Sequence, residues 1–341
     1  MVYDGARGGA RLSLRPAPTR GNPVARGGGG GVGPALRLFA LVTTIVLYGV
    51  VVLGFLDTAT GSALGCGRSF PLCDGRFFPA PTLTSVVEWT HRVVSAFGGV
   101  LVLALAVWAW LAARASAHVR VLAIVGLGFL VVESIVGALA VVAPEPAPLI
   151  AVHLGIALTS FGAVAALSLI LWGGGRVLAA GEGPAVPQAL RRWLWATLAF
   201  TYVVVYLGAL VAQEHVGLAC GGWPLCQGGI VPHAWSFAVA LDFVHRLAAV
   251  ASLVVFWLLT RRLRPVRALR PGLYRAGHVA FGLVVLTALS GGYLALSGVA
   301  LAATLVHVGL VTLLFATVLT MCALATPARA AQARGAAVAA S

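Results

Sequence analysis

The chain has 341 residues, of which 60% are hydrophobic and only 9% are charged, and its mean hydropathy is +0.99. An ordinary soluble domain has about 25% charged residues, so this composition excludes a soluble globular protein, a disordered chain and a nucleic-acid-binding domain. All 23 basic residues behind the net charge of +14 are Arg. The lipid bilayer is the expected solvent for most of the chain.

Residues 1–34 are rich in Gly, Arg and Pro, which predicts a disordered basic tail. Eight apolar runs follow, and each is long enough for a helix to cross the hydrocarbon core. Because backbone groups in lipid must find partners within their own segment, the runs are predicted to be helices. Their approximate ranges are 35–56, 85–112, 119–143, 149–172, 193–213, 238–260, 276–297 and 301–324.

The arginines predict the orientation of these spans. All but four of them lie in tails and connections on one side of the predicted membrane, and the exceptions are Arg68, Arg76, Arg92 and Arg246. An excess of basic residues marks the cytoplasmic side. Both termini are therefore expected in the cytoplasm.

The two halves of the chain repeat at an offset of 154 residues. The offset places Cys66 on Cys220, and it also carries His91 onto His245 and His153 onto His307. Because Cys and His do not align by chance at one offset in an apolar chain, the match predicts an internal duplication. The predicted fold class is an all-α integral membrane protein, with eight transmembrane helices in two tandemly duplicated four-helix bundles. The predicted domains after the tail are a first unit (35–172), a cytoplasmic linker (173–192), a second unit (193–324) and a cytoplasmic tail (325–341).

Four histidines lie inside the even-numbered spans, each four to seven residues from the outer end: His91, His153, His245 and His307. At 1.5 Å per residue this places each about 6–11 Å below the outer surface. Two imidazoles that face each other at one depth of a four-helix bundle suit axial ligation of a haem iron. The alternative is a hydrogen bond between helices. The repetition of the pair favours haem, since ionisable groups inside a membrane are usually functional.

A carboxylate precedes the first histidine of each pair by three residues, Glu88 before His91 and Asp242 before His245. Each carboxylate therefore shares a helical face with its histidine. A di-iron centre needs about four carboxylates. The first unit offers at most Glu88 and Glu133, so such a centre is not expected. Glu133 lies in the middle of a span, where it either faces the cavity of the first bundle or pairs with a polar neighbour.

The outer ends of the spans carry two further features. Arg92 and Arg246 follow their histidines directly, and each either pairs with a haem propionate or reaches the lipid headgroups. Two close cysteine pairs, Cys66 with Cys73 and Cys220 with Cys226, lie in outer loops. That side is oxidising in bacteria, so a disulfide is expected in each loop. The disulfides serve either to staple the loops or as redox-active pairs, although their spacing is wider than the CxxC of thiol oxidoreductases.

The sequence resembles the haem A synthase family of integral membrane proteins over residues 36–324. In the first half the resemblance rests on Gly54, Thr60-Gly61-Ser62, Cys66, Pro71-Leu72-Cys73, Glu88-Trp89-Thr90-His91-Arg92 and His153-Leu154. In the second half it rests on Gly208-Ala209-Leu210-Val211, Cys220-Gly221-Gly222-Trp223-Pro224-Leu225-Cys226, His245-Arg246 and His307. The combination is specific, whereas no single motif is. The resemblance points to a bacterial member of high-GC type.

This resemblance implies an enzyme that oxidises a methyl group of haem O to a formyl group, with water as the oxygen source. The product, haem A, would serve terminal oxidase assembly. The first unit would hold the haem O substrate between His91 and His153, and the second a haem b cofactor between His245 and His307. Glu88 matches the acidic residue that the family carries near the substrate.

The resemblance also implies a location in the bacterial inner membrane. Membrane lipid and a prenyl-transferring haem O synthase are the expected partners, no nucleic acid is expected, and a homo-oligomer is left open. Two other functions fit the same residues. One is a b-type cytochrome that only carries electrons, and the other is a membrane thiol oxidoreductase that works through the outer cysteines. Asp242 is expected to have a secondary role.

Overall fold

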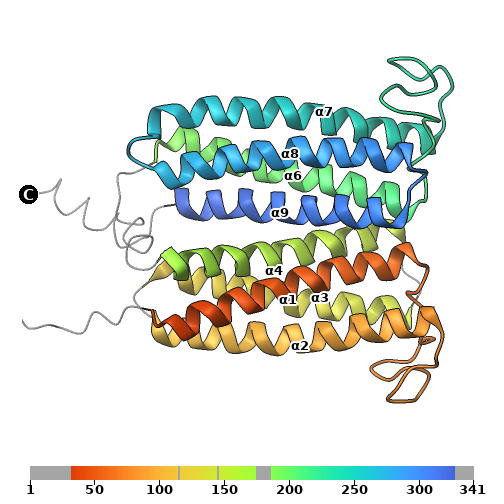
Figure 1. Cartoon of the computed structure of the whole chain (residues 1–341), viewed down its shortest axis with the longest axis horizontal. Coiled ribbons are helices and arrows are strands. Elements are labelled where there is room, and N and C mark those ends of the chain that lie inside the picture. The colour runs from red at the N-terminus through yellow and green to blue at the C-terminus, as the bar shows by residue number, and fades with distance from the viewer. Residues whose placement is uncertain (1–31, 114–115, 144–145, 174–185, 327–341) are drawn as a thin grey trace, which may run out of the picture. The chain divides into compact units, whose positions relative to one another are not determined.

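The computed structural model describes residues 32–113, 116–143, 146–173 and 186–326. Within these ranges, eight helices are long and apolar enough to cross a membrane (Figure 1), which confirms the eight predicted spans. Most of the predicted tails and the predicted linker lie outside the described residues. The helices are α1 (Pro34–Ala59), α2 (Leu83–Ala112), α3 (Ala117–Val142), α4 (Ala147–Gly173), α6 (Gln188–Gln213), α7 (Phe237–Leu263), α8 (Pro271–Leu296) and α9 (Leu301–Ala325), with a short 3-10 helix η2 (Arg264–Val266) after α7.

Several helices extend beyond the apolar runs that predict them. Helix α6 begins at Gln188 and α8 at Pro271, so Arg275 lies inside α8 rather than in a connection. Proline favours the start of α8 because its φ angle suits a helix and its missing N–H is not needed in the first turn. The starts of α2 and α7 are capped by Thr82 and Ser236, whose hydroxyl oxygens accept a hydrogen bond from the backbone three residues later.

Each half of the chain closes into a ring of four helices. In the first half, α1, α2, α3 and α4 pack in chain order and α4 returns to α1, and α6 to α9 pack in the same way. The halves meet mainly through their fourth helices, because α4 packs against α9 and α6, and α9 against α1. The α4 and α9 spans are 72% and 61% buried, whereas the other six are 17–28% buried. The fourth helices therefore form the centre, and the other six are left to face lipid.

Two tyrosines cross the boundary between the halves at positions 154 residues apart. The hydroxyl of Tyr48 on α1 lies against Gly309 of α9, and the hydroxyl of Tyr202 on α6 lies against Gly155 of α4. A β-carbon at either glycine would overlap the tyrosine oxygen, so a larger residue there would displace the tyrosine ring from this contact. Each of these glycines follows a span histidine by two residues. The boundary therefore runs close to the histidines.

The two long loops, one between α1 and α2 and one between α6 and α7, lie at the same end of the helices (Figure 1). The first contains the disulfide Cys66–Cys73 and the second the disulfide Cys220–Cys226. In each loop the second cysteine also forms a short backbone bridge to the residue three positions later. The loops are thus compact, and they lie over the end at which α2 and α7 begin.

Candidate functional site

The first histidine of each pair packs its imidazole against a glycine of the preceding helix. A β-carbon on Gly54 would lie 3.1 Å from Cε1 of His91, and one on Gly208 would lie 2.8 Å from Cε1 of His245. Carbon atoms in contact are normally about 3.5–4.0 Å apart, so a larger residue would displace either ring. Both histidines lie eight residues into their helices, about 12 Å from the start.

The second histidine of each pair has the same kind of neighbour. A β-carbon on Gly137 of α3 would lie 3.2 Å from Cε1 of His153, and one on Gly291 of α8 would lie 3.2 Å from Cε1 of His307. Both histidines lie six residues into their helices, about 9 Å from the start. His153 lies within electrostatic range of His91, and His307 lies within electrostatic range of His245. Each half therefore brings its two imidazoles together at nearly one level.

Glu88 and Asp242 tie the histidine-bearing helices to the disulfide loops. Oε2 of Glu88 accepts a 2.7 Å hydrogen bond from the backbone N–H of Cys66. Oδ2 of Asp242 accepts a 3.0 Å hydrogen bond from the backbone N–H of Cys220. Both carboxylates are buried. A buried carboxylate needs such donors, because an unpaired charge in an apolar medium is costly.

Arg92 and Arg246 complete these anchors. Arg92 forms an ion pair with Glu88, one turn before it, and donates hydrogen bonds to the carbonyls of Ser69 (2.8 Å) and Leu72 (3.0 Å). Arg246 binds both oxygens of its own carboxylate partner, at 2.8 and 3.0 Å, and donates to the carbonyl of Gly222. The guanidinium groups therefore hold the outer loops in place. Pairing with a haem propionate or with lipid headgroups stays a prediction for both residues.

Acidic residues distinguish the first half from the second. Asp57 of α1 is buried, its Oδ1 has no hydrogen-bond partner among the described residues, and it lies within electrostatic range of Glu88 and Arg92. The expectation that the first unit offers at most Glu88 and Glu133 is therefore wrong: its sequence also contains Asp57, Asp74 and Glu145, and Asp57 lies inside a helix. The repeat reveals the omission of Asp57, since the equivalent position in the second half is Val211. Within the described ranges no three His, Cys, Asp or Glu residues are grouped so that they could hold a metal ion.

Glu133 lies beside the second histidine of the first half. Its Oε1 is 3.4 Å from Nε2 of His153. Of the two alternatives that the sequence leaves open, the structure therefore shows pairing with a polar neighbour. At the equivalent position of the second half stands Thr287, whose hydroxyl bonds to a carbonyl of its own helix. The second half therefore has uncharged residues at the positions equivalent to Asp57 and Glu133.

The histidine pairs fit axial ligation of a haem iron. Nδ1 of His91 and Nδ1 of His153 are buried and have no hydrogen-bond partner among the described residues. Glycines beside all four rings leave room at the ring edges. Two imidazoles in an apolar bundle are the donor set of a bis-histidine haem, whereas hard cations such as magnesium prefer oxygen ligands.

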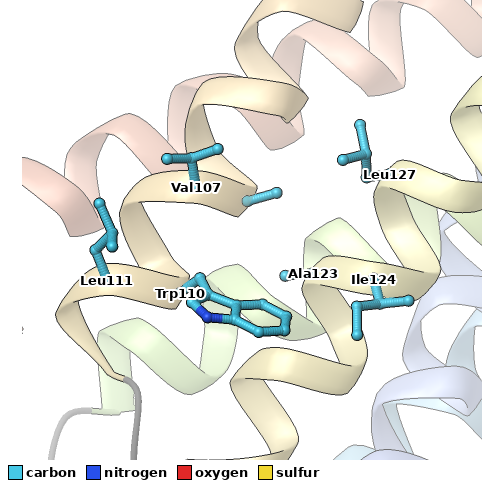
Figure 2. A pocket seen from close by; sticks show the side chains of 7 residues that line it. Val107, Trp110, Leu111, Ala123, Ile124 and Leu127 are labelled. Atoms are coloured by element: carbon cyan, nitrogen blue, oxygen red, sulfur yellow. The ribbon is translucent and has the colours of Figure 1, made fainter.

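A separate apolar hollow lies between α2 and α3 near their other end (Figure 2). It has a volume of about 240 Å³, and Trp110, Ile124 and Leu127 are among the residues that line it. Ala106, which also lines it, is about 22 Å along α2 from His91. The hollow is lined by apolar side chains and is remote from the histidines, so it supplies no group to this site.

Comparison with known proteins places the chain in a family. Residues 37–319 match the family model COX15-CtaA, described as cytochrome oxidase assembly protein. The chain is 35% identical to the haem A synthase of Bacillus licheniformis over 288 residues, which cover 82% of this chain and 93% of that protein. It is 35% identical to the haem A synthase of Symbiobacterium thermophilum over 301 residues (86% and 96%) and 34% identical to that of Geobacillus kaustophilus over 293 residues (82% and 88%). The chain therefore belongs to the COX15-CtaA family of cytochrome oxidase assembly proteins.

Proposed function

We propose that this protein is a haem A synthase, an oxidoreductase that converts a methyl group of haem O to a formyl group. The similarity to bacterial proteins of that name supports the proposal. The observation that carries it is the difference between the halves. Both halves have a histidine pair with a buried carboxylate three residues before its first member. Only the first half has two further carboxylates inside its helices at matched positions of the repeat: Asp57 and Glu133 stand where the second half has Val211 and Thr287.

The overall reaction explains why the additional carboxylates, Asp57 and Glu133, belong to one half. It is R–CH3 + H2O → R–CHO + 4 H⁺ + 4 e⁻, in which the oxygen comes from water and the electrons go to an external one-electron acceptor. The half that carries out this oxidation must accept protons close to the substrate. A half that only holds a redox cofactor needs no such acceptors.

The halves would divide the work accordingly. The first would hold haem O between His91 and His153, and the second would hold haem b between His245 and His307. Bound haem b would supply one-electron redox capacity. Glu88 would accept a proton at a carboxylate oxygen, while its neighbouring donors fix the orientation of that carboxylate. In this proposal the first unit spans residues 35–172 and the second residues 193–324.

We place the protein in the bacterial inner membrane, with both termini in the cytoplasm. Arg261 and Arg262 lie in the last turn of α7, at the end opposite to the disulfide loops. Basic residues mark the cytoplasmic side, and disulfides persist on the oxidising side. A haem O synthase is the partner that this reaction requires, because it would supply the substrate.

The proposal is tested by identifying the haems that the protein holds. The full-length protein is purified from cells that make haem O, its haems are extracted, and each is identified by mass. Haem O or haem A beside haem b is the expected result. Haem b alone would instead indicate an electron carrier, and a folded protein without haem would indicate a thiol oxidoreductase.

A further inference from the structure

The histidines of α4 and α9 are held through different ring nitrogens. Nδ1 of His307 lies 2.9 Å from the hydroxyl oxygen of Ser290. That hydroxyl donates its single hydrogen to the carbonyl of Thr287 at 2.8 Å, so we assign the ring hydrogen of His307 to Nδ1, from which the hydroxyl oxygen can accept. The Nε2 lone pair of His307 is then available to iron, and the outer hydrogen bond holds the ring in that tautomer.

His153 shows the opposite arrangement. Its Nδ1 has no hydrogen-bond partner among the described residues, and its Nε2 lies 3.4 Å from Oε1 of Glu133. The contact is partly shielded, since the two side chains are 24% and 14% exposed. A carboxylate accepts hydrogen bonds, so it draws the N–H of the ring to Nε2. The nitrogen that the second half offers to iron is the one that Glu133 contacts in the first half.

The sequences of the two halves differ at the two positions that determine which ring nitrogen is contacted. The position equivalent to Ser290 is Val136, which has no group to bind Nδ1. The position equivalent to Glu133 is Thr287, whose hydroxyl donates to the carbonyl of Leu283 in its own helix and not to the histidine. Each half therefore has one of the two partners and lacks the other.

We propose that Glu133 is an intramolecular competitor for the haem iron at His153 and makes haem binding in the first half readily reversible. The proposal rests on the proposed function, in which the first half binds a substrate and releases a product. Iron and the carboxylate cannot contact the same nitrogen at the same time. Glu133 would therefore contact Nε2 of His153 when a haem dissociates. The second half keeps its cofactor, because Ser290 supports ligation there rather than opposing it. Glu133 is thus a positioning residue that acts through His153.

The test measures how fast haem leaves each half. The full-length protein in lipid nanodiscs is loaded with ferric haem b as the probe and mixed with excess apomyoglobin, and haem transfer is followed by absorbance. Two phases are expected. The faster is assigned to the first half by its absence in His153→Ala, and the slower to the second by its absence in His307→Ala.

Glu133→Leu should slow the faster phase about fivefold to tenfold, the factor that corresponds to a contact of about 1–1.4 kcal/mol. The slower phase should not change, which also shows that the protein is folded. A purely structural role for Glu133 predicts the opposite sign, namely faster loss. The control is Ser134→Ala, since this exposed hydroxyl only bonds to its own helix. Both phases should be unaltered in that variant.

A reciprocal variant tests the same idea without removing Glu133. Thr287→Glu combined with Ser290→Val gives the second half the pattern of the first, and it should accelerate the slower phase. An unchanged or faster first phase in Glu133→Leu, or an unchanged slower phase in the reciprocal variant, would overturn the competition. If the parent protein has no phase that His153→Ala removes, the first half holds no haem. The assignment of the substrate to that half is then the part that fails, and the competition fails with it.

Discussion

The backbone N–H of Cys66 donates a 2.7 Å hydrogen bond to Oε2 of Glu88. The first outer disulfide is thus joined directly to the carboxylate that we propose as a proton acceptor. Ser85, one turn earlier on α2, donates its hydroxyl hydrogen to the carbonyl of Gly65 at 2.5 Å, which adds a second link between loop and helix. A change in the loop is therefore transmitted to Glu88 and, along the same helix, to His91.

Replacing Glu88 with Gln is expected to abolish haem A formation while the fold and the haem b are retained. The amide keeps the shape of the side chain, but it cannot take up a proton at neutral pH. Mass spectrometry of the haems from cells that make haem O should show unreacted haem O or the first hydroxylated product. Asp242→Asn is the matched comparison. It should disturb haem b retention or potential and slow turnover only in part, whereas a normal haem A yield from Glu88→Gln would remove the proposed role.

Replacing either His245 or His307 with Ala should remove the haem b absorption band from the purified protein. Each variant loses one of the two proposed axial ligands, in an apolar site where water is a poor substitute. The measurement is the reduced-minus-oxidised spectrum per mole of protein. His278→Ala is the control, because this exposed ring contacts only its own helix, through the carbonyl and the ring of Tyr274. Full haem b content in both ligand variants would contradict the assignment.

Gly208→Ala should also lower the haem b content, although it removes no ligand. The new β-carbon would lie 2.8 Å from Cε1 of His245, so the ring must move. Gly282→Ala on α8 is the control, since a β-carbon there meets nothing within 4 Å. In an unstrained helix this substitution normally stabilises by about 0.5–1 kcal/mol. Equal haem b content in the two variants would show that the ring position does not depend on Gly208.

Replacing both Cys220 and Cys226 with Ser should lower the thermal stability but leave turnover in the protein that stays folded. Closing a loop with a sequence separation of 6 contributes about 2 kcal/mol in the chain-entropy model. The midpoint of thermal unfolding and the haem A yield per folded, haem-loaded molecule are the two measurements. If that folded variant makes no haem A at all, the pair takes part in the chemistry and is more than a staple.

Much of the fold could be predicted because it depends on composition. Apolar runs of sufficient length must be helices in lipid, and the structure confirms all eight. The disulfides could be predicted equally well, because cysteines six and seven residues apart in one loop readily meet. The starts of α6 and α8 could not be predicted in this way, because Gln188 and Pro271 begin these helices in polar sequence that hydropathy does not mark.

The site was predicted less completely, for reasons that differ by residue. Asp57 lies three residues after Gly54 in an apolar helix, and only a residue-by-residue comparison of the halves shows that it has no counterpart. The partners of Arg92 are backbone carbonyls of a folded loop, which no motif encodes. The contact of Glu133 with His153 depends on how α3 and α4 are rotated against each other, and spacing along one helix does not determine that.

The glycine that receives Tyr48 is 261 residues further along the chain, at Gly309. At about 5–20 residues per second, a ribosome delivers it roughly 10–50 s after the tyrosine. Until then this tyrosine lacks its partner, and between the synthesis of α4 and that of α9 the face of α4 that packs against α9 has no helix to cover it. Biogenesis of the protein therefore includes an interval in which the first half is inserted but not assembled. A ribosome that stalls between α4 and α9 would leave a product with an open lateral surface, which the membrane quality-control machinery could recognise.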